Sequence, residues 1–92
     1  MPLTGPSLGA LRILLVEDSP EDAELMSEQM LDAGLEARCE RVESEAELRQ
    51  ALASFQPDIV LSDLSMPGFS GDDALRIVRE TAPDVPLSLI HI

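Results

Sequence analysis

The chain contains few aromatic residues, a single cysteine and no lysine. Only two Phe residues are present, without any Trp or Tyr, so a core must be built from Leu, Ile, Val, Ala and Met. Aliphatic cores of this kind suit parallel sheets that are covered by helices. The single Cys39 cannot form an internal disulfide. We therefore expect a reduced, cytoplasmic protein in which Cys39 is a small buried apolar residue.

Basic residues and long apolar segments are also scarce. Six Arg stand against 18 acidic residues, which gives a net charge of -12. Such a charge repels nucleic acid phosphates and anionic lipid, so we expect no direct contact with nucleic acid or membranes. No segment approaches the roughly 20 apolar residues that span a bilayer. The N-terminus also lacks the charged and apolar regions of a signal peptide.

The length and the composition predict one small soluble domain. A chain of 92 residues is too short for two cores. Its content of 45% hydrophobic and 26% charged residues is typical of a globular protein. Residues 1–10 are rich in Pro, Gly, Ser and Thr, which predicts a flexible lead-in. Residues 11–92 are then expected to form the domain.

The first half of this domain shows a strand, a helix and a second strand. The apolar run LRILLV at residues 11–16 is typical of a strand buried on both faces. Ser19 follows at an N-cap position and Pro20 at the first helical position, and Gly34 supplies a helix end. Residues 35–42 alternate apolar and polar side chains, which predicts an edge strand with one solvated side.

The second half repeats the alternation. Ser44 and Glu47 have the spacing of a capping box, and a helix is expected to follow until Pro57. Residues 59–61 form an apolar strand that stops at Asp63. In the helix between Ser44 and Pro57, the apolar face is expected at four residues: Leu48, Ala51, Leu52 and Phe55.

A turn-rich loop at residues 64–71 precedes a third helix, and residues 87–92 form a fourth apolar run. We expect Phe69 in this loop to be exposed or half-exposed. The strict alternation of strands and helices along the chain predicts right-handed crossovers and a parallel α/β sheet between layers of helices. The buried face of the third helix is predicted at three residues: Ala74, Leu75 and Val78.

Two of the expected strands end in acidic residues, Glu17 and Asp18 after the first and Asp63 at the third. Ligands of open parallel sheets bind beyond the carboxyl ends of the strands, where these carboxylates meet if the strands are neighbours. Close carboxylates resist joint ionisation unless a cation such as Mg²⁺ joins them. A carboxylate beside Mg²⁺ can attack phosphorus. Asp63, alone at its strand end, is the better nucleophile, and the paired acids are the better metal ligands.

Acids after a strand also commonly cap the next helix, and Asp18 or Ser19 could do so without a metal. Either acidic turn alone favours that simpler interpretation. Both turns in this order, together with the following loop, favour a site.

The segments LRILLVEDSPEDAEL and PDIVLSDLSMPGFSG resemble the two signature segments of response-regulator receiver domains, and the resemblance covers residues 11 to 86. It implies a flavodoxin-like, three-layer, doubly wound α/β fold with strand order 2-1-3-4. It further implies that Asp63 is the phosphoacceptor, Asp18 a direct Mg²⁺ ligand and Glu17 a ligand through water. The backbone carbonyl of Ser65 completes the implied metal shell.

The C-terminal segment departs from the family pattern. Receivers carry a Ser or Thr at the end of the fourth strand and a Lys at the end of the fifth, whereas here the first position falls on His91 and no Lys is present. We therefore expect the fifth strand and the last helix to be missing. His91 could bind phosphate and act as the switch residue. We favour the alternative that it only belongs to a frayed or non-native terminus.

The resemblance implies two-component signalling by a phosphoacceptor domain that is not an enzyme. A sensor histidine kinase or phosphotransfer protein would supply the phosphoryl group to Asp63, and an effector domain or downstream protein would respond. One alternative is a Mg²⁺-dependent phosphohydrolase with an Asp nucleophile. Haloacid-dehalogenase-like enzymes of that kind have a second Asp where this chain has Ser65. The other alternative is a pseudo-receiver that binds partners without phosphorylation.

Overall fold

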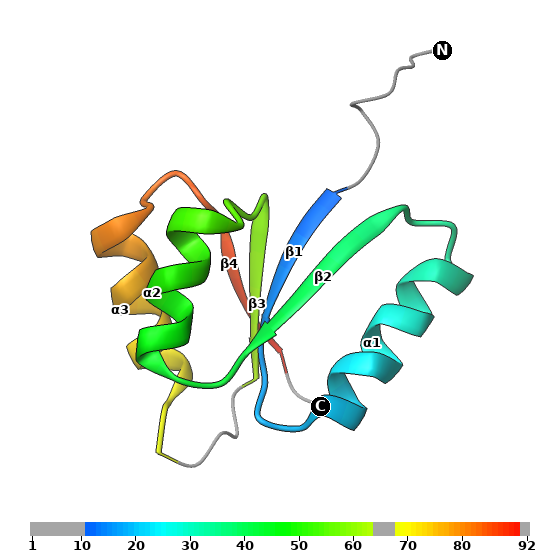
Figure 1. Ribbon diagram of the computed structural model, residues 1–92, viewed down its shortest axis with the longest axis horizontal. Helices are drawn as coiled ribbons and strands as arrows, with labels where there is room; N and C mark the ends of the chain where they lie inside the picture. The colour runs from blue at the N-terminus through cyan, green and yellow to red at the C-terminus, as the bar shows by residue number, and fades with distance from the viewer. Residues whose placement is uncertain (1–10, 64–67, 91–92) are drawn as a thin grey trace.

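The computed structural model describes residues 11–63 and 68–90, and these form a four-stranded parallel sheet between two layers of helices (Figure 1). The strand order is β2-β1-β3-β4. Helix α1 covers one face of the sheet, and α2 and α3 cover the other. The expected flavodoxin-like fold and strand order are confirmed. In chain order the elements are β1 (Leu11–Val16), α1 (Pro20–Asp32), β2 (Ala37–Val42), α2 (Glu45–Ser54), β3 (Ile59–Asp63), α3 (Gly71–Thr81) and β4 (Leu87–Ile90).

Strand β1 lies in the middle of the sheet, between β2 and β3. Leu14 and Val16 are buried on the face of α2 and α3, whereas Ile13 and Leu15 belong to the cluster on the face of α1. Both faces of the strand therefore need apolar side chains. This explains why its sequence is a continuous apolar run rather than an alternation.

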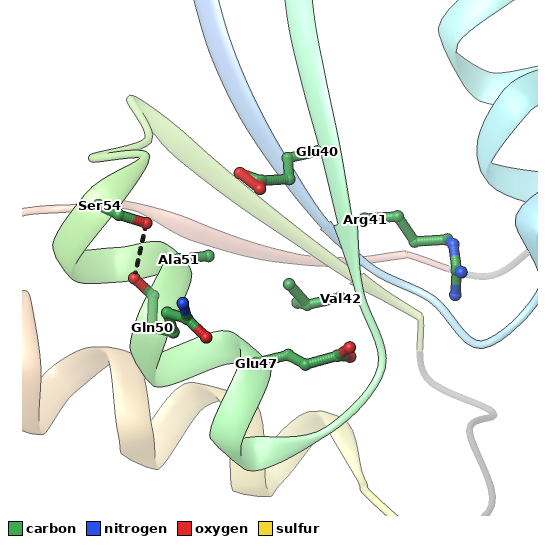
Figure 2. A pocket seen from close by; sticks show the side chains of 7 residues that line it. All are labelled: Glu40, Arg41, Val42, Glu47, Gln50, Ala51 and Ser54. Carbon is green, nitrogen blue, oxygen red and sulfur yellow. Dashed lines mark hydrogen bonds between the residues drawn. The ribbon is translucent and has the colours of Figure 1, made fainter.

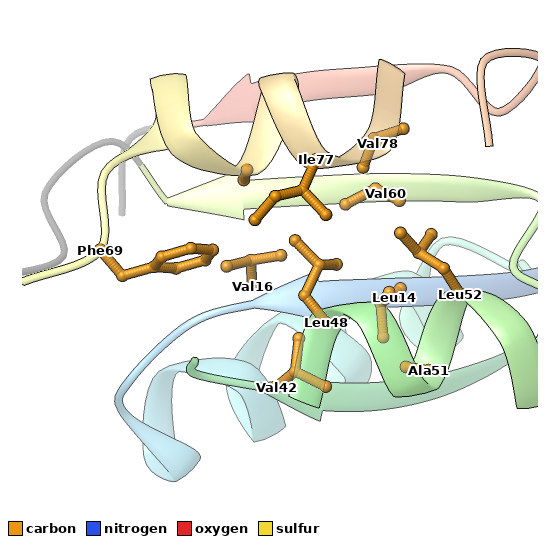
Figure 3. Packing of buried hydrophobic residues seen from close by; sticks show 11 residues of the cluster. Leu14, Val16, Val42, Leu48, Ala51, Leu52, Val60, Phe69, Ile77 and Val78 are labelled. Carbon is orange, nitrogen blue, oxygen red and sulfur yellow. The ribbon is translucent and has the colours of Figure 1, made fainter. Parts of the chain in front are cut away.

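The larger core cluster fills the space between the sheet and helices α2 and α3 (Figure 3). Leu48 of α2 and Ile77 of α3 are fully buried there. Phe69 enters the same cluster and is only 8% exposed, so the expectation of an exposed loop residue was wrong. On α3 the expectation for Leu75 was also wrong, because Leu75 is only partly buried and Ile77 takes the inward position beside Ala74 and Val78.

The smaller cluster, formed by Ile13, Leu15 and Ala23, lies between the sheet and α1. Cys39 packs against it but is half-buried rather than fully buried, because β2 is an edge strand. Leu35 was expected within this strand, yet it lies outside β2 and is 47% exposed. The edge strand is therefore shorter and more exposed to solvent than predicted.

Three serine caps fix where the helices begin. Ser19 Oγ accepts a hydrogen bond from the Asp22 N–H at 3.2 Å, as its sequence position predicted. Ser44 caps α2. The Glu47 carboxylate, however, accepts a hydrogen bond at 2.9 Å from the N–H of Glu43 and not from that of Ser44, so this is not a standard capping box. A complete capping box starts α3 instead, between Ser70 and Asp73. No helix in residues 11–63 and 68–90 is long and apolar enough to cross a membrane.

Candidate metal centre

Strands β1 and β3 are neighbours, and Val16 pairs with Ser62 near their carboxyl ends. The residues that follow this pair, Glu17 and Asp63, therefore emerge at the same edge of the sheet. Oxygen atoms of Glu17, Asp18 and Asp63 all lie within 4.8 Å of one another. The structure thus brings together the three carboxylates that the sequence predicted to converge.

Glu17 is the most buried member of this cluster, with 1% of its surface exposed. Its Oε1 accepts a hydrogen bond from the Ser19 N–H at 3.0 Å. Its Oε2 is buried and has no hydrogen-bond partner among residues 11–63 and 68–90. Burial raises the pKa of Glu17 from 4.5 to about 7, and the carboxyl groups of Asp18 and Asp63 add to this rise, while the Ser19 N–H opposes it.

The other two carboxylates differ in how solvent reaches them. Asp63 ends β3 and is 7% exposed, whereas Asp18 lies in the turn before α1 and is exposed. A divalent cation fits this arrangement, since the donors are all oxygen atoms and the buried Oε2 of Glu17 lacks a donor. Bound Mg²⁺ would also relieve the repulsion among the carboxylates. Ser65 and His91, which the sequence also suggested, lie outside the described residues.

Strand β2 holds the turn formed by Glu17 and Asp18 in place. The Glu17 N–H donates to the Val42 carbonyl at 3.0 Å, and Arg41 Nη1 donates to the Glu17 carbonyl at 3.2 Å. Arg41 was not predicted as part of the site, because it lies 24 positions from Glu17 in the sequence. A strand-pairing register would have been needed to find this contact.

A hollow lies between β2 and α2 (Figure 2). Its volume is about 210 Å³, and its lining includes Val42, Glu47 and Ser54 but none of the three clustered acids. This hollow is therefore not part of the candidate metal centre.

The response regulator receiver domain family matches residues 13–91, and the chain belongs to this family. It is 32% identical over 78 residues to the DNA-binding transcriptional regulator NtrC of Escherichia coli K12. It is 33% identical over 78 residues to a protein-glutamate methylesterase/protein-glutamine glutaminase of a Nocardioides strain. These matches cover 85% and 84% of this chain, but only 16% and 21% of the relatives.

Solved receiver structures share the fold. The MaeR response regulator bound to beryllium trifluoride superposes with a TM-score of 0.73 at 28% identity. The receiver domain of sensor histidine kinase PA1611 from Pseudomonas aeruginosa PAO1, with magnesium coordinated in its active-site cleft, has a TM-score of 0.71 at 25% identity. Each match covers 88% of this chain and 66% of the solved chain. The chain is thus a receiver domain of phosphorylation-based two-component signalling.

Proposed function

We propose that Asp63 accepts a phosphoryl group from a phosphohistidine on a sensor histidine kinase or phosphotransfer protein. The observation that carries this proposal is the convergence of Glu17, Asp18 and Asp63 within 4.8 Å at the carboxyl edge of the sheet. Asp18 and Asp63 would hold Mg²⁺ directly and Glu17 through water, with the Ser65 carbonyl completing the protein's share. The magnesium in the cleft of the PA1611 receiver supports this assignment.

In the proposed transfer, an Asp63 carboxylate oxygen forms a bond to phosphorus while the bond between phosphorus and the donor imidazole nitrogen breaks. The released imidazole keeps the electron pair of that bond. Bound Mg²⁺ would neutralise charge on the transferred phosphoryl oxygens. Because only 7% of Asp63 is exposed, the donor must approach along the carboxyl edge of the sheet. The product is an acyl phosphate on Asp63.

Glu17 would adjust the charge of the site. Its pKa of about 7 means that a substantial fraction of Glu17 is protonated near neutrality in the metal-free protein. A divalent cation favours the ionised carboxylate, so binding releases that proton. The cluster therefore avoids three closely spaced negative charges before the metal arrives.

The phosphorylated state would be read by an effector domain or a downstream protein. The two relatives have different outputs, one a DNA-binding transcriptional regulator and the other a methylesterase/glutaminase, so they support the receiver role without defining the output. We propose that this domain itself signals rather than catalyses turnover. A cytoplasmic location fits its single cysteine.

Incubation with acetyl phosphate and Mg²⁺, followed by intact mass spectrometry, tests the proposal. We expect the mass of one phosphoryl group to be added to the wild-type chain. Asp63→Ala, and wild type with excess EDTA, should show no gain. No gain in wild type would instead favour a pseudo-receiver, and an equal gain in Asp63→Ala would place the acceptor elsewhere.

A further inference from the structure

Arg41 reaches from β2 to the first acidic turn. Its side chain leaves the sheet on the side opposite to Glu40 and Val42, which face the hollow beside α2 (Figure 2). Arg41 Nη1 donates to the carbonyl oxygen of Glu17 at 3.2 Å and to Glu43 Oε2 at 3.0 Å. The side chain is 31% exposed, so water competes only partly for these hydrogen bonds. Arg41 therefore joins the ends of β1 and β2.

The carbonyl that Arg41 holds belongs to the peptide group between Glu17 and Asp18. This group is planar, so a hydrogen bond to its oxygen also restrains the backbone of Asp18. The preceding peptide is held as well, because the Glu17 N–H donates to the Val42 carbonyl at 3.0 Å. Both peptide groups that flank the Glu17 Cα are thus fixed by residues of β2.

Asp18 depends on this support more than its neighbours do. Glu17 and Asp63 are buried, so packing restrains their side chains, whereas Asp18 is exposed. The direction in which the Asp18 side chain leaves the backbone, along its Cα–Cβ bond, therefore follows from the peptide groups on either side of it. Arg41 holds the peptide before Asp18, and Ser19 caps α1 directly after it.

We propose that Arg41 is a positioning residue for the metal site, because its hydrogen bond to the Glu17 carbonyl holds the backbone from which the Asp18 side chain projects. It acts through this hydrogen bond rather than through its charge, because the Glu43 carboxylate at 3.0 Å already offsets the guanidinium. The inference rests on the proposed function, since Asp18 is positioned for the Mg²⁺ proposed above. It goes further in assigning a role at this site to a residue of the edge strand.

The test compares Arg41→Met with Arg38→Met. Arg38 is exposed on the opposite face of β2, so its substitution removes the same charge without touching Glu17. The dissociation constant for Mg²⁺ is measured by titrating backbone amide chemical shifts. We expect it to rise about tenfold in Arg41→Met, as for other residues that orient metal ligands. Arg38→Met should remain within about twofold of wild type.

A second measurement separates positioning from general stability. The urea concentration at the midpoint of metal-free unfolding should be nearly the same for Arg41→Met and wild type, because one partly exposed ion pair contributes little to stability. Equal Mg²⁺ affinities in Arg41→Met and Arg38→Met would overturn the role of Arg41 and leave the proposed function intact. Absence of Mg²⁺ binding in wild type would overturn both.

If Arg41→Met does not fold, Glu43→Gln provides the comparison. It removes the carboxylate that holds the guanidinium but leaves Arg41 and the buried core unchanged. We expect a loss of Mg²⁺ affinity that is smaller than the loss of about tenfold expected for Arg41→Met, because Arg41 itself remains. An affinity equal to that of Arg38→Met would then count against the positioning role.

Discussion

Val16 of β1 pairs with Ser62 of β3, and this register places Glu17 beside Asp63 at the carboxyl edge of the sheet. Side chains alternate between the two faces along a strand, so a slip by one residue would turn one of the acids to the opposite face. The acidic cluster therefore depends on strand pairing in the core as much as on the acidic residues themselves.

The pKa of Glu17 predicts how the stability of the metal-free protein changes with pH. The folded state binds the Glu17 proton with a pKa of about 7, against an ordinary value of 4.5. Protonated Glu17 therefore contributes its full stabilisation below the unfolded-state pKa of 4.5. This stabilisation is lost as the pH rises through the folded-state pKa of about 7. Denaturant unfolding in EDTA should show a loss of about 2–3 kcal/mol between about pH 5 and about pH 8.

Glu17→Gln is the control for this pH dependence. The amide cannot ionise, so the variant should lack the loss assigned to Glu17 while other titrating groups still contribute. The difference between the two pH profiles isolates the Glu17 proton. Parallel profiles for wild type and Glu17→Gln would show that this carboxyl does not have a raised pKa.

Mg²⁺ should stabilise the folded protein, and Asp18 should carry much of the effect. A ligand that binds only the folded state raises the unfolding free energy with its concentration. Asp18→Asn should weaken Mg²⁺ binding at least about tenfold. Glu21→Gln removes an exposed carboxylate from the first turn of α1 and should leave the affinity nearly unchanged. Thermal unfolding at increasing Mg²⁺ concentration measures both, and similar losses in the two variants would indicate screening rather than a site.

Mg²⁺ affinity should also depend on pH. Protonated Glu17 competes with the cation, so the apparent dissociation constant should fall as the pH rises through the Glu17 pKa of about 7. In Glu17→Gln this dependence should disappear. An affinity that stays constant across this range in wild type would mean that the Glu17 proton is not displaced by the metal.

Phe69 should stabilise the domain more than a loop residue usually does. It is 8% exposed and packs into the cluster between the sheet and α2 and α3 (Figure 3). Phe69→Ala should cost about 3–5 kcal/mol of unfolding free energy, because it removes a buried ring and leaves a cavity. Leu25→Ala, at a side chain 52% exposed, should change stability by no more than about 0.5 kcal/mol. Equal effects in urea unfolding would contradict the buried position of Phe69.

Much of the fold follows from local sequence patterns. The apolar runs that became β1 and β3 and the serine caps of α1 and α2 were all visible in the residues. Strand order was implied only by the family resemblance, because periodicity does not specify which strands pair. Phe69 was misplaced because a loop sequence does not show whether an aromatic side chain folds back into the core. Leu75 was misplaced because it and Ile77 are both apolar and lie two positions apart on one helix.

The candidate site was predictable to a similar degree. The three acids could be found because they lie at the ends of two apolar strands. The near-complete burial of Glu17 and the contact from Arg41 could not be predicted from the sequence, because both depend on how β2 packs beside β1. Local sequence thus identified the candidate metal ligands, whereas their protonation and orientation depend on tertiary structure.

Phosphorylation of Asp63 can be located directly. After treatment with acetyl phosphate and Mg²⁺, borohydride reduction converts an aspartyl phosphate to homoserine, and peptide mass spectrometry then locates the modified residue. We expect conversion at position 63 alone, with none in the absence of Mg²⁺ and none in Asp63→Asn. Conversion at Glu17 or Asp18 instead, or at position 63 to the same extent in the presence of EDTA, would contradict it.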